Sequence, residues 1–320
     1  MRARRPPSRA AIRYTCLGTG VRQMALLALD IGATKIAVGL VGADGVTHEV
    51  GRIAVPPNGI WEAVRGLLLA AANGHTVSIV GIGACGPVDA TVGVVEPLNI
   101  PEWREGFALV DAVRETFPGA TVRMAVDGVC LALAERHFGA ARQTPDALAM
   151  TVSSGIGGGI IVGGMVAVGR TGNAGHIGHM IVPGSTDPCA CGGVGCVEAV
   201  ASGPSAVRWA RERGWEGDTG VELAASAEAG DRIAKAALRR AGIALGQVIS
   251  SAAALLDVDL VVLGGGFAQA GEPLWRPLQE ALGAHARIGF LGDLRVVPSE
   301  LGENATLVGA GLLTALAPQA

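Results

Sequence analysis

The chain has 320 residues, half of them hydrophobic and 49 of them glycine, so it is long enough for two globular domains rich in tight turns. No apolar run reaches the roughly 18 residues of a membrane span, which argues against an integral membrane protein. The formal net charge is -3, with no acidic or basic block in the body of the chain, which removes the electrostatic case for nucleic-acid binding.

The first 23 residues are basic and contain proline, but they lack the apolar core of a secretory signal. A strand pattern begins directly after them, at Met24. We expect residues 1–23 to be a disordered tail or a mis-assigned start, the alternative being a functional arm. Without an export signal we expect a cytoplasmic protein with reduced cysteines, which favours metal binding over disulfides.

The first half of the chain predicts an α/β unit. Two β-rich runs after Met24 are joined by a tight turn at 32–35, and Asp30 lies at the end of the first run. Further strands are expected at 46–55, 77–84 and 120–126, and helices at 59–73, 107–117 and 129–138. In such sheets, ligands bind at the carboxyl ends of the strands.

The second half repeats this plan. Strands at 147–152 and 159–168 again flank a glycine turn, at 153–159. We then expect mostly helix at 203–256, a buried strand at 260–263, a helix opening at 264–266, a strand at 294–297 and a last helix at 305–316. The expected domains are a small one, 24–125 plus 305–320, and a large one, 126–304. Two similar halves predict a cleft between them.

Both glycine turns have the composition of phosphate sites. In the first, backbone N–H groups, Thr34 and Lys35 could hold phosphate oxygens while Asp30 orients Mg²⁺ through water. One glycine hairpin is equally compatible with an ordinary β-turn, but two turns facing one cleft favour phosphate. Gly264 to Gly266 lie between a strand and a helix, where absent side chains admit a ribose or base, or merely close packing.

Asp127 directly follows the strand expected at 120–126, at the edge where ligands bind. A carboxylate there could accept the proton of a substrate hydroxyl as that hydroxyl attacks phosphorus. Aspartate is also a favoured N-cap, and Asp127 could instead cap a helix beginning at Gly128. Because two phosphate-type turns are expected nearby, we favour the role of a base.

The stretch 176–198 has the composition of a metal site. Cys189, Cys191 and Cys196 follow the spacing Cys-x-Cys-Gly-x-x-Gly-Cys, and His176 and His179 lie upstream. Structural zinc takes four tetrahedral ligands from cysteine and histidine, and short cysteine spacings let one loop surround one ion. The alternative is a loop with small buried cysteines or a disulfide. We favour zinc.

Seven segments together resemble the ROK family of repressors, open-reading-frame proteins and sugar kinases. They are DIGATK at 30–35, GIGACGPVD at 81–89, the strand end at Asp127, SSGIGGG at 153–159, AGHIGH at 174–179, CACGGVGCVE at 189–198 and VLGGGF at 262–267. The resemblance runs from Met24 to the C-terminus. It implies an α/β, actin-like (ribonuclease H-like) two-domain sugar kinase with an interdomain cleft, usually a homodimer, that uses ATP and Mg²⁺.

The resemblance also implies a role for each matching residue. Asp127 would be the general base for a primary, O6-type hydroxyl, and His179 with Cys189, Cys191 and Cys196 would hold a structural zinc that braces sugar-contacting side chains. Acceptor binding is implied for Gly86, Asn99, Val126, Asp127, His176, His179 and Glu198. Nucleotide binding is implied for Asp30, Gly32, Thr34, Lys35, Ser154, Gly155, Gly265 and Gly266.

The chain departs from the family pattern around the acceptor. Most members carry Asn where this chain has Val126 and Glu where it has His176, while Cys85 replaces a usual Pro and Ser153 a usual Gly. Losing one polar partner of a substrate hydroxyl in a closed site costs about 1–3 kcal/mol. We therefore expect a kinase for the primary hydroxyl of a non-standard ring, such as an aminosugar or a C7-cyclitol.

Two alternatives stay open, an ordinary glucokinase or hexose 6-kinase with compensated substitutions, and a catalytically inactive sugar sensor. A repressor is disfavoured, because repressors that the family contains carry an N-terminal helix-turn-helix and only 23 residues precede Met24 here.

Overall fold

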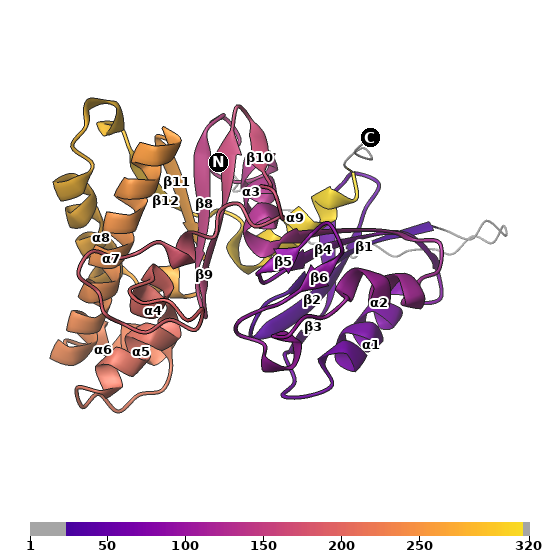
Figure 1. Cartoon of the computed structure of the whole chain (residues 1–320), viewed down its shortest axis with the longest axis horizontal. Coiled ribbons are helices and arrows are strands. Elements are labelled where there is room, and N and C mark those ends of the chain that lie inside the picture. Colours follow the sequence, from indigo (N-terminus) through magenta and orange to yellow (C-terminus); the bar gives the residue numbers. More distant parts are fainter. Residues whose placement is uncertain (1–23, 316–320) are drawn as a thin grey trace, which may run out of the picture.

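The computed structural model describes residues 24–315; the basic stretch 1–23 and the last residue of the helix predicted at 305–316 lie outside the described residues. Two five-stranded sheets dominate this part of the chain (Figure 1). Both have the same order, an antiparallel meander of three strands continued by two parallel strands. The α/β class and the repeated plan are therefore confirmed.

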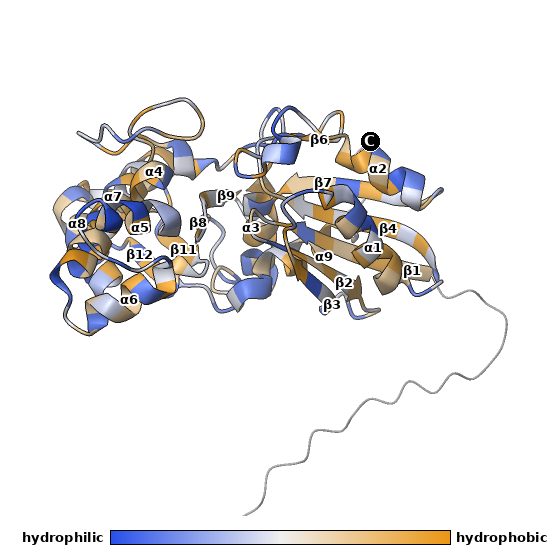
Figure 2. Cartoon of the chain, turned by 90° about the horizontal axis from the view of Figure 1, so that it is seen from below, coloured by the Kyte–Doolittle hydropathy of each residue, from blue (hydrophilic) through white to orange (hydrophobic). Residues whose placement is uncertain are grey.

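The first sheet has the order β3-β2-β1-β4-β7. Its strands are β1 (Met24–Ile31), β2 (Lys35–Val41), β3 (Thr47–Ala54), β4 (Thr76–Ala84) and β7 (Thr121–Val126). Helices α1 (Ile60–Ala72) and α2 (Leu109–Thr116) lie on one side of it and α9 (Ala305–Leu313) on the other (Figure 1). A small hairpin, β5 (Val88–Asp89) with β6 (Val94–Val95), follows β4. The sheet and α9 carry mostly hydrophobic residues (Figure 2).

The second sheet has the order β10-β9-β8-β11-β12. Its strands are β8 (Ala147–Val152), β9 (Ile156–Val162), β10 (Met165–Ala167), β11 (Leu260–Gly264) and β12 (Arg295–Pro298). The helices of this half are α3 (Asp127–His137), α4 (Val197–Ala201), α5 (Gly203–Arg211), α6 (Gly220–Glu228), α7 (Arg232–Leu256) and α8 (Glu272–His285). Throughout the described part of the chain, every helix is too short or too polar to span a lipid bilayer.

Successive side chains of β8 point alternately into two different hydrophobic cores, which explains why helices cover both faces of the second sheet. Leu148 and Met150 belong to the core that α7 helps to form, whereas Ala147 and Ala149 belong to a separate core with Leu131 of α3. Successive side chains of a strand point to opposite faces, so a continuous apolar run fits a strand buried on both. The small alanines let α3 approach closely.

Helix α3 packs between the two sheets. Val129 and Cys130 join the core of the first sheet, while Leu131 joins the core beneath the second. A Cβ built on Gly128 would lie 1.9 Å from the carbonyl oxygen of Gly158 on β9, so the main chains of α3 and β9 are in direct contact. Any larger residue at this contact would push the helix off the sheet.

Three predicted boundaries are wrong, each for an identifiable reason. The second glycine turn occupies 153–155 rather than 153–159, because the later glycines belong to β9 and serve the contact with α3. The strand predicted at 159–168 is divided by a turn at Gly163 and Gly164, both at positive φ. The helix that opens at 264–266 is only a short 3₁₀ helix, Phe267–Gln269, with Gly266 at its N-cap position; α8 begins separately at Glu272, with Pro273 in its first turn.

The contact between α3 and α9 yields a stability prediction. A Cβ on Gly309 would lie 1.8 Å from the carbonyl oxygen of Cys130, so Gly309→Ala must separate the two helices. We expect this variant to lose about 1–3 kcal/mol of unfolding free energy, typical of overpacking. Thermal and urea unfolding followed by circular dichroism measures the loss.

Gly66 provides the matched control, because it lies inside α1 and a Cβ added to it would have no atom within 4 Å. Gly66→Ala should be neutral or stabilising by up to about 1 kcal/mol, since alanine is the better helix former. Equal unfolding midpoints for the two variants would contradict the close contact of α3 and α9.

Candidate active site

A cleft of about 380 Å³ lies where the loops at the carboxyl ends of both sheets meet. Strand pairing explains the convergence: Ile31 of β1 pairs with Ala84 of β4, which pairs with Val126 of β7, so the residues after each strand share one edge. Fourteen of the fifteen residues predicted to bind substrate or nucleotide line the cleft, namely Asp30, Gly32, Thr34, Lys35, Gly86, Asn99, Asp127, Ser154, Gly155, His176, His179, Glu198, Gly265 and Gly266.

Asp127 is the first residue of α3 and lies in the cleft. The residue at the N-cap position is Val126, so the alternative role of Asp127 as N-cap is not taken. Desolvation raises the pKa of Asp127 to about 6, helped by the charge of Glu198, although the N–H of Gly128 donates to Oδ1 at 2.7 Å and opposes the rise. A carboxyl group with a pKa close to neutral is well suited to take up and release a proton.

Asp30 lies at the end of β1 and is 6% exposed. Burial raises its pKa to about 7, and the charge of Asp127 adds to the rise, while Lys35 and Arg52 lower it. A buried carboxylate with incomplete charge compensation favours a bound cation, and oxygen ligands are those that Mg²⁺ prefers. The residues around Asp30 therefore fit a magnesium ion.

Lys35 extends from the first turn, but its Nζ binds Glu303 Oε2 at 3.1 Å. Arg52 Nη1 binds the same oxygen at 3.2 Å. The side chains of Lys35 and Glu303 are 34% and 63% exposed, and exposed ion pairs contribute only about 0–1 kcal/mol. This pair is too weak to keep Lys35 from an incoming phosphate.

Glu198 of α4 reaches the second glycine turn. Its Oε2 accepts a hydrogen bond from the N–H of Ile156 at 2.8 Å, and a Cβ on Gly155 would lie 2.7 Å from that oxygen. The same Cβ position lies 3.5 Å from Nδ2 of Asn99. Glu198 and Asn99, which are far apart in sequence, thus both lie next to Gly155. A side chain at position 155 would collide with the Glu198 carboxylate.

Val126 is the one predicted binding residue that does not line the cleft. It is 3% exposed, and its Cγ2 lies 3.1 Å from the Cβ position of Gly86. The last side chain of β7 points into the core, whereas Asp127 begins the helix and turns toward the cleft. The structure therefore does not bring Val126 to the wall of the cleft, and its contact with an acceptor stays a prediction.

His176 is half-buried against Gly86. A Cβ on Gly86 would lie 2.8 Å from both Nε2 and Cε1 of the imidazole. Burial lowers the pKa of His176, and the nearby His179 lowers it further. The imidazole is therefore uncharged near neutral pH.

His179, Cys189, Cys191 and Cys196 form a four-residue cluster whose ligand atoms all lie within 4.8 Å of one another. Nδ1 of His179 faces Cys189 Sγ at 3.8 Å, while the His179 side chain also lines the cleft. The five described cysteines are free thiols, which removes the disulfide alternative within residues 24–315. Three sulfurs and one nitrogen at this separation fit tetrahedral zinc.

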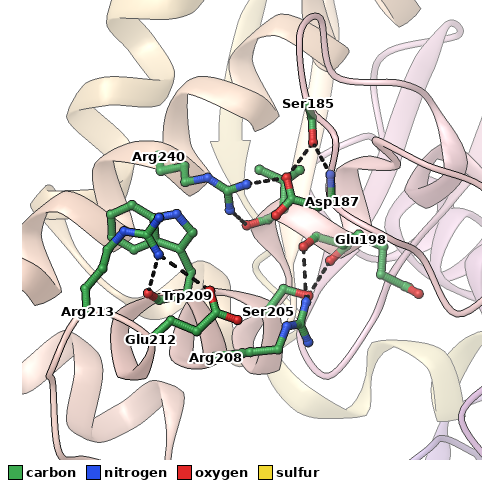
Figure 3. Close-up of polar contacts among 11 residues, drawn as sticks. Ser185, Asp187, Glu198, Ser205, Arg208, Trp209, Glu212, Arg213 and Arg240 are labelled. Carbon is green, nitrogen blue, oxygen red and sulfur yellow. Dashed lines mark hydrogen bonds and ion pairs between the residues drawn. The ribbon is translucent and has the colours of Figure 1, made fainter.

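Polar contacts tie the cysteine-rich loop to the helices behind it (Figure 3). Arg240 of α7 donates to Asp187 Oδ2 at 2.5 Å and to the carbonyl of Val200 at 3.2 Å. Ser205 Oγ of α5 donates to the carbonyl of Glu198 at 2.9 Å. These anchors were missed from the sequence, because their partners lie in different elements and no motif joins them.

A second cavity, of about 840 Å³, borders the cleft at Ser153, Ser154, Gly266 and Gln269. Its wall includes Arg208 of α5 and Phe267, which follows β11. The sequence predicted close approach of a ligand at Gly265 and Gly266 but gave no indication of this adjoining space.

Comparisons with known proteins agree with this geometry. A family model described as the ROK family matches residues 26–317. The chain is 32% identical over 307 residues to a glucokinase of Thermotoga maritima, covering 90% of this chain and 96% of that one. It is 33% identical over 242 residues to an N-acetylmannosamine kinase of Yersinia pestis, covering 75% of this chain and 82% of that one.

A solved structure gives the same result for the fold. The ROK family glucokinase from Streptomyces griseus, in complex with glucose and AMPPNP, is similar with a TM-score of 0.79 and 32% identity, covering 90% of this chain and 98% of that chain. The actin-like two-domain fold of ROK sugar kinases is thereby confirmed. On the family match and these similarities, the chain belongs to the ROK family.

Proposed function

We propose that this protein transfers the γ-phosphoryl group of ATP to the primary hydroxyl of a non-standard sugar or sugar-like ring, such as an aminosugar or a C7-cyclitol. Its relatives make it an ATP-dependent sugar kinase. The observation that carries the reaction is Asp127, a carboxyl group with a pKa of about 6 in a cleft between two glycine turns. The acceptor is the new part of the proposal.

In this mechanism Asp127 accepts the proton of the acceptor's primary hydroxyl. The hydroxyl oxygen forms a bond to the γ-phosphorus, the bond from that phosphorus to the β–γ bridging oxygen breaks, and ADP leaves. Asp30 would hold Mg²⁺, which neutralises phosphate charge when bound. Thr34, Lys35 and the turn at Ser154 and Gly155 would position the phosphates, and the adjoining cavity has room for the nucleoside.

The zinc that the cysteine cluster fits would be structural. His179, Cys189, Cys191 and Cys196 would fill all four positions, which leaves none for a substrate. The ion would fix the loop that carries His179 and leads into α4, where Glu198 lies. These side chains would then bind acceptor hydroxyls without adjusting when the ring enters.

The changed positions argue for an unusual acceptor. Where the family usually has Glu, His176 offers an uncharged imidazole, and where it usually has Asn, the chain has the apolar Val126 next to Gly86. Relatives at similar identity are named for two different sugars, so overall similarity does not fix the acceptor. The first alternative is an ordinary glucokinase, and the second is a catalytically inactive sugar sensor. The homodimer and the domain limits at residues 125 and 305 stay predictions.

Asp127→Asn tests the mechanism. The amide cannot accept the proton, so we expect kcat to fall about 10²- to 10⁴-fold while the Kd for ATP stays nearly unchanged. The wild type should also lose kcat/KM below about pH 6, where Asp127 becomes protonated, provided that saturating Mg²⁺ keeps Asp30 ionised. ADP release measured between pH 5 and pH 8 gives both quantities.

Asp111→Asn is the control, because Asp111 is exposed on α2 and pairs only with Arg114 at the surface. It should leave both kcat and the pH profile unchanged. A protein that binds sugar but shows no turnover in the wild type, with Asp127→Asn altering affinity alone, would be a sensor rather than a kinase.

The acceptor is tested with a panel of hexoses, aminosugars and cyclitols at equal concentration, with ATP consumption as the readout. We expect the highest kcat/KM for a ring other than glucose, because the usual carboxylate partner is absent at His176. Phosphorus NMR of the product should show a phosphomonoester on the primary carbon. A clear preference for glucose would establish the ordinary glucokinase instead.

A further inference from the structure

Asn173 lies on the loop between β10 and His176, and its amide is paired with the main chain of Val88 in β5. Oδ1 accepts from the N–H of Val88 at 2.9 Å, and Nδ2 donates to the carbonyl of Val88 at 2.6 Å. An amide reversed end for end would place donor against donor and acceptor against acceptor. The two contacts together therefore fix which end of the amide is oxygen.

The orientation of this amide determines the hydrogen on His176. Nε2 of His176 lies 3.0 Å from Oδ1 of Asn173, and a carbonyl oxygen can only accept, so Nε2 must carry the hydrogen. A neutral imidazole has one N–H, which leaves Nδ1 as a bare acceptor. Among the hydrogen bonds of residues 24–315, none involves this Nδ1, while the side chain itself lines the cleft.

The loop that carries Asn173 also joins the two halves of the molecule. The N–H of Ala90 donates to the carbonyl of Thr171 at 3.1 Å, and Nδ2 of Asn173 donates to Thr171 Oγ1 at 3.0 Å. β10 belongs to the second sheet, whereas Val88 and Ala90 follow β4 of the first. His176 is thus held between Asn173 and Gly86 at the junction of both halves.

We propose that Asn173 is a positioning residue that fixes His176 as a hydrogen-bond acceptor, so that the cleft selects a ring with a hydrogen-bond donor, such as a hydroxyl or an acylated amine, opposite His176. The proposal rests on the kinase function, because it assumes that the ligand of the cleft is a polyhydroxylated ring. A glutamate at position 176 would accept through two charged oxygens and would also attract a protonated amine. His176 offers a single uncharged nitrogen as acceptor in its place.

The hydrogen on His176 is measured directly by NMR of protein labelled with ¹⁵N-histidine, at about pH 8, where an ordinary imidazole is neutral. The signal of His176 is identified by its loss in His176→Gln. We expect a protonated Nε2 and a bare Nδ1 in the wild type, and a mixture of both forms in Asn173→Ala. A wild type with the hydrogen on Nδ1, or a spectrum unchanged in Asn173→Ala, would overturn the proposal.

Kinetics give the second readout. Asn173→Ala should raise the KM for the acceptor at least about twofold, the cost of selecting one form of His176 from an even mixture, with kcat and the KM for ATP unchanged. Thr171→Val is the matched control: it removes one contact of Asn173 but leaves the bond to His176, and should change neither the NMR spectrum nor the KM. An equal rise in the KM for ATP would indicate a general structural defect and contradict the proposal.

Substrate analogues test the direction of the hydrogen bond. In the best acceptor, each hydroxyl or amine group on the ring is replaced in turn by hydrogen or by fluorine. Fluorine can accept a hydrogen bond but cannot donate one. At one position we expect both replacements to lose about tenfold in kcat/KM, and the loss to disappear in His176→Ala. If fluorine restores activity, His176 donates and the proposal is wrong. If no ring is phosphorylated at all, the kinase function fails, while the NMR spectrum still decides the hydrogen on His176.

Discussion

The main-chain contact between α3 and β9 is the constraint on which the cleft depends. Gly128 follows Asp127 directly, and its Cα faces the carbonyl of Gly158 with no room for a side chain. Because α3 is packed into the cores of both sheets, this contact sets the position of Asp127 relative to both glycine turns. Residues of both halves line the cleft around this one carboxylate, so Asp127 lies between the groups that the two sheets contribute.

Charge is the second constraint on the cleft. Asp30, Asp127 and Glu198 bring three carboxyl groups into one cleft. Desolvation is the main cause that raises the pKa of Asp30 to about 7 and that of Asp127 to about 6; the charge of Asp127 adds to the rise at Asp30, and the charge of Glu198 adds to the rise at Asp127. A cation bound beside Asp30 would keep that carboxyl group ionised despite its raised pKa. Asp127 would then be the group left to exchange a proton near neutral pH.

The metal-type cluster and its anchors supply rigidity on the acceptor side. Arg240 and Ser205 fasten the cysteine-rich loop and α4 to α7 and α5, so Glu198 reaches the cleft from a fixed support (Figure 3). Local spacing predicted the three cysteines and an upstream histidine, because all lie in one short stretch, and the family resemblance selected His179 rather than His176. The anchors depend on contacts between distant elements and could not be predicted in this way.

Features with a local sequence pattern were predicted, whereas features that depend on contacts between distant elements were missed. Strand ends and glycine turns have local patterns, and the cleft residues they imply were found. The glycines at 157–159 were mistaken for a turn because their role, contact with α3, is tertiary. Val126 was expected at the acceptor because the family usually has a polar Asn at that position; the valine side chain instead packs into the core of the first sheet. Asn173 went unnoticed because Val88, its partner, is 85 residues away.

The central claim is that this chain keeps the family's phosphoryl-transfer residues, while His176 in place of the usual Glu makes it bind a different acceptor. The most direct measurement is the ratio of kcat/KM for glucose to that for the best other acceptor, in the wild type and in His176→Glu. We expect the ratio to rise at least about tenfold in the variant, because the usual carboxylate partner of the ring is restored. An unchanged ratio, with glucose already preferred by the wild type, would contradict the account.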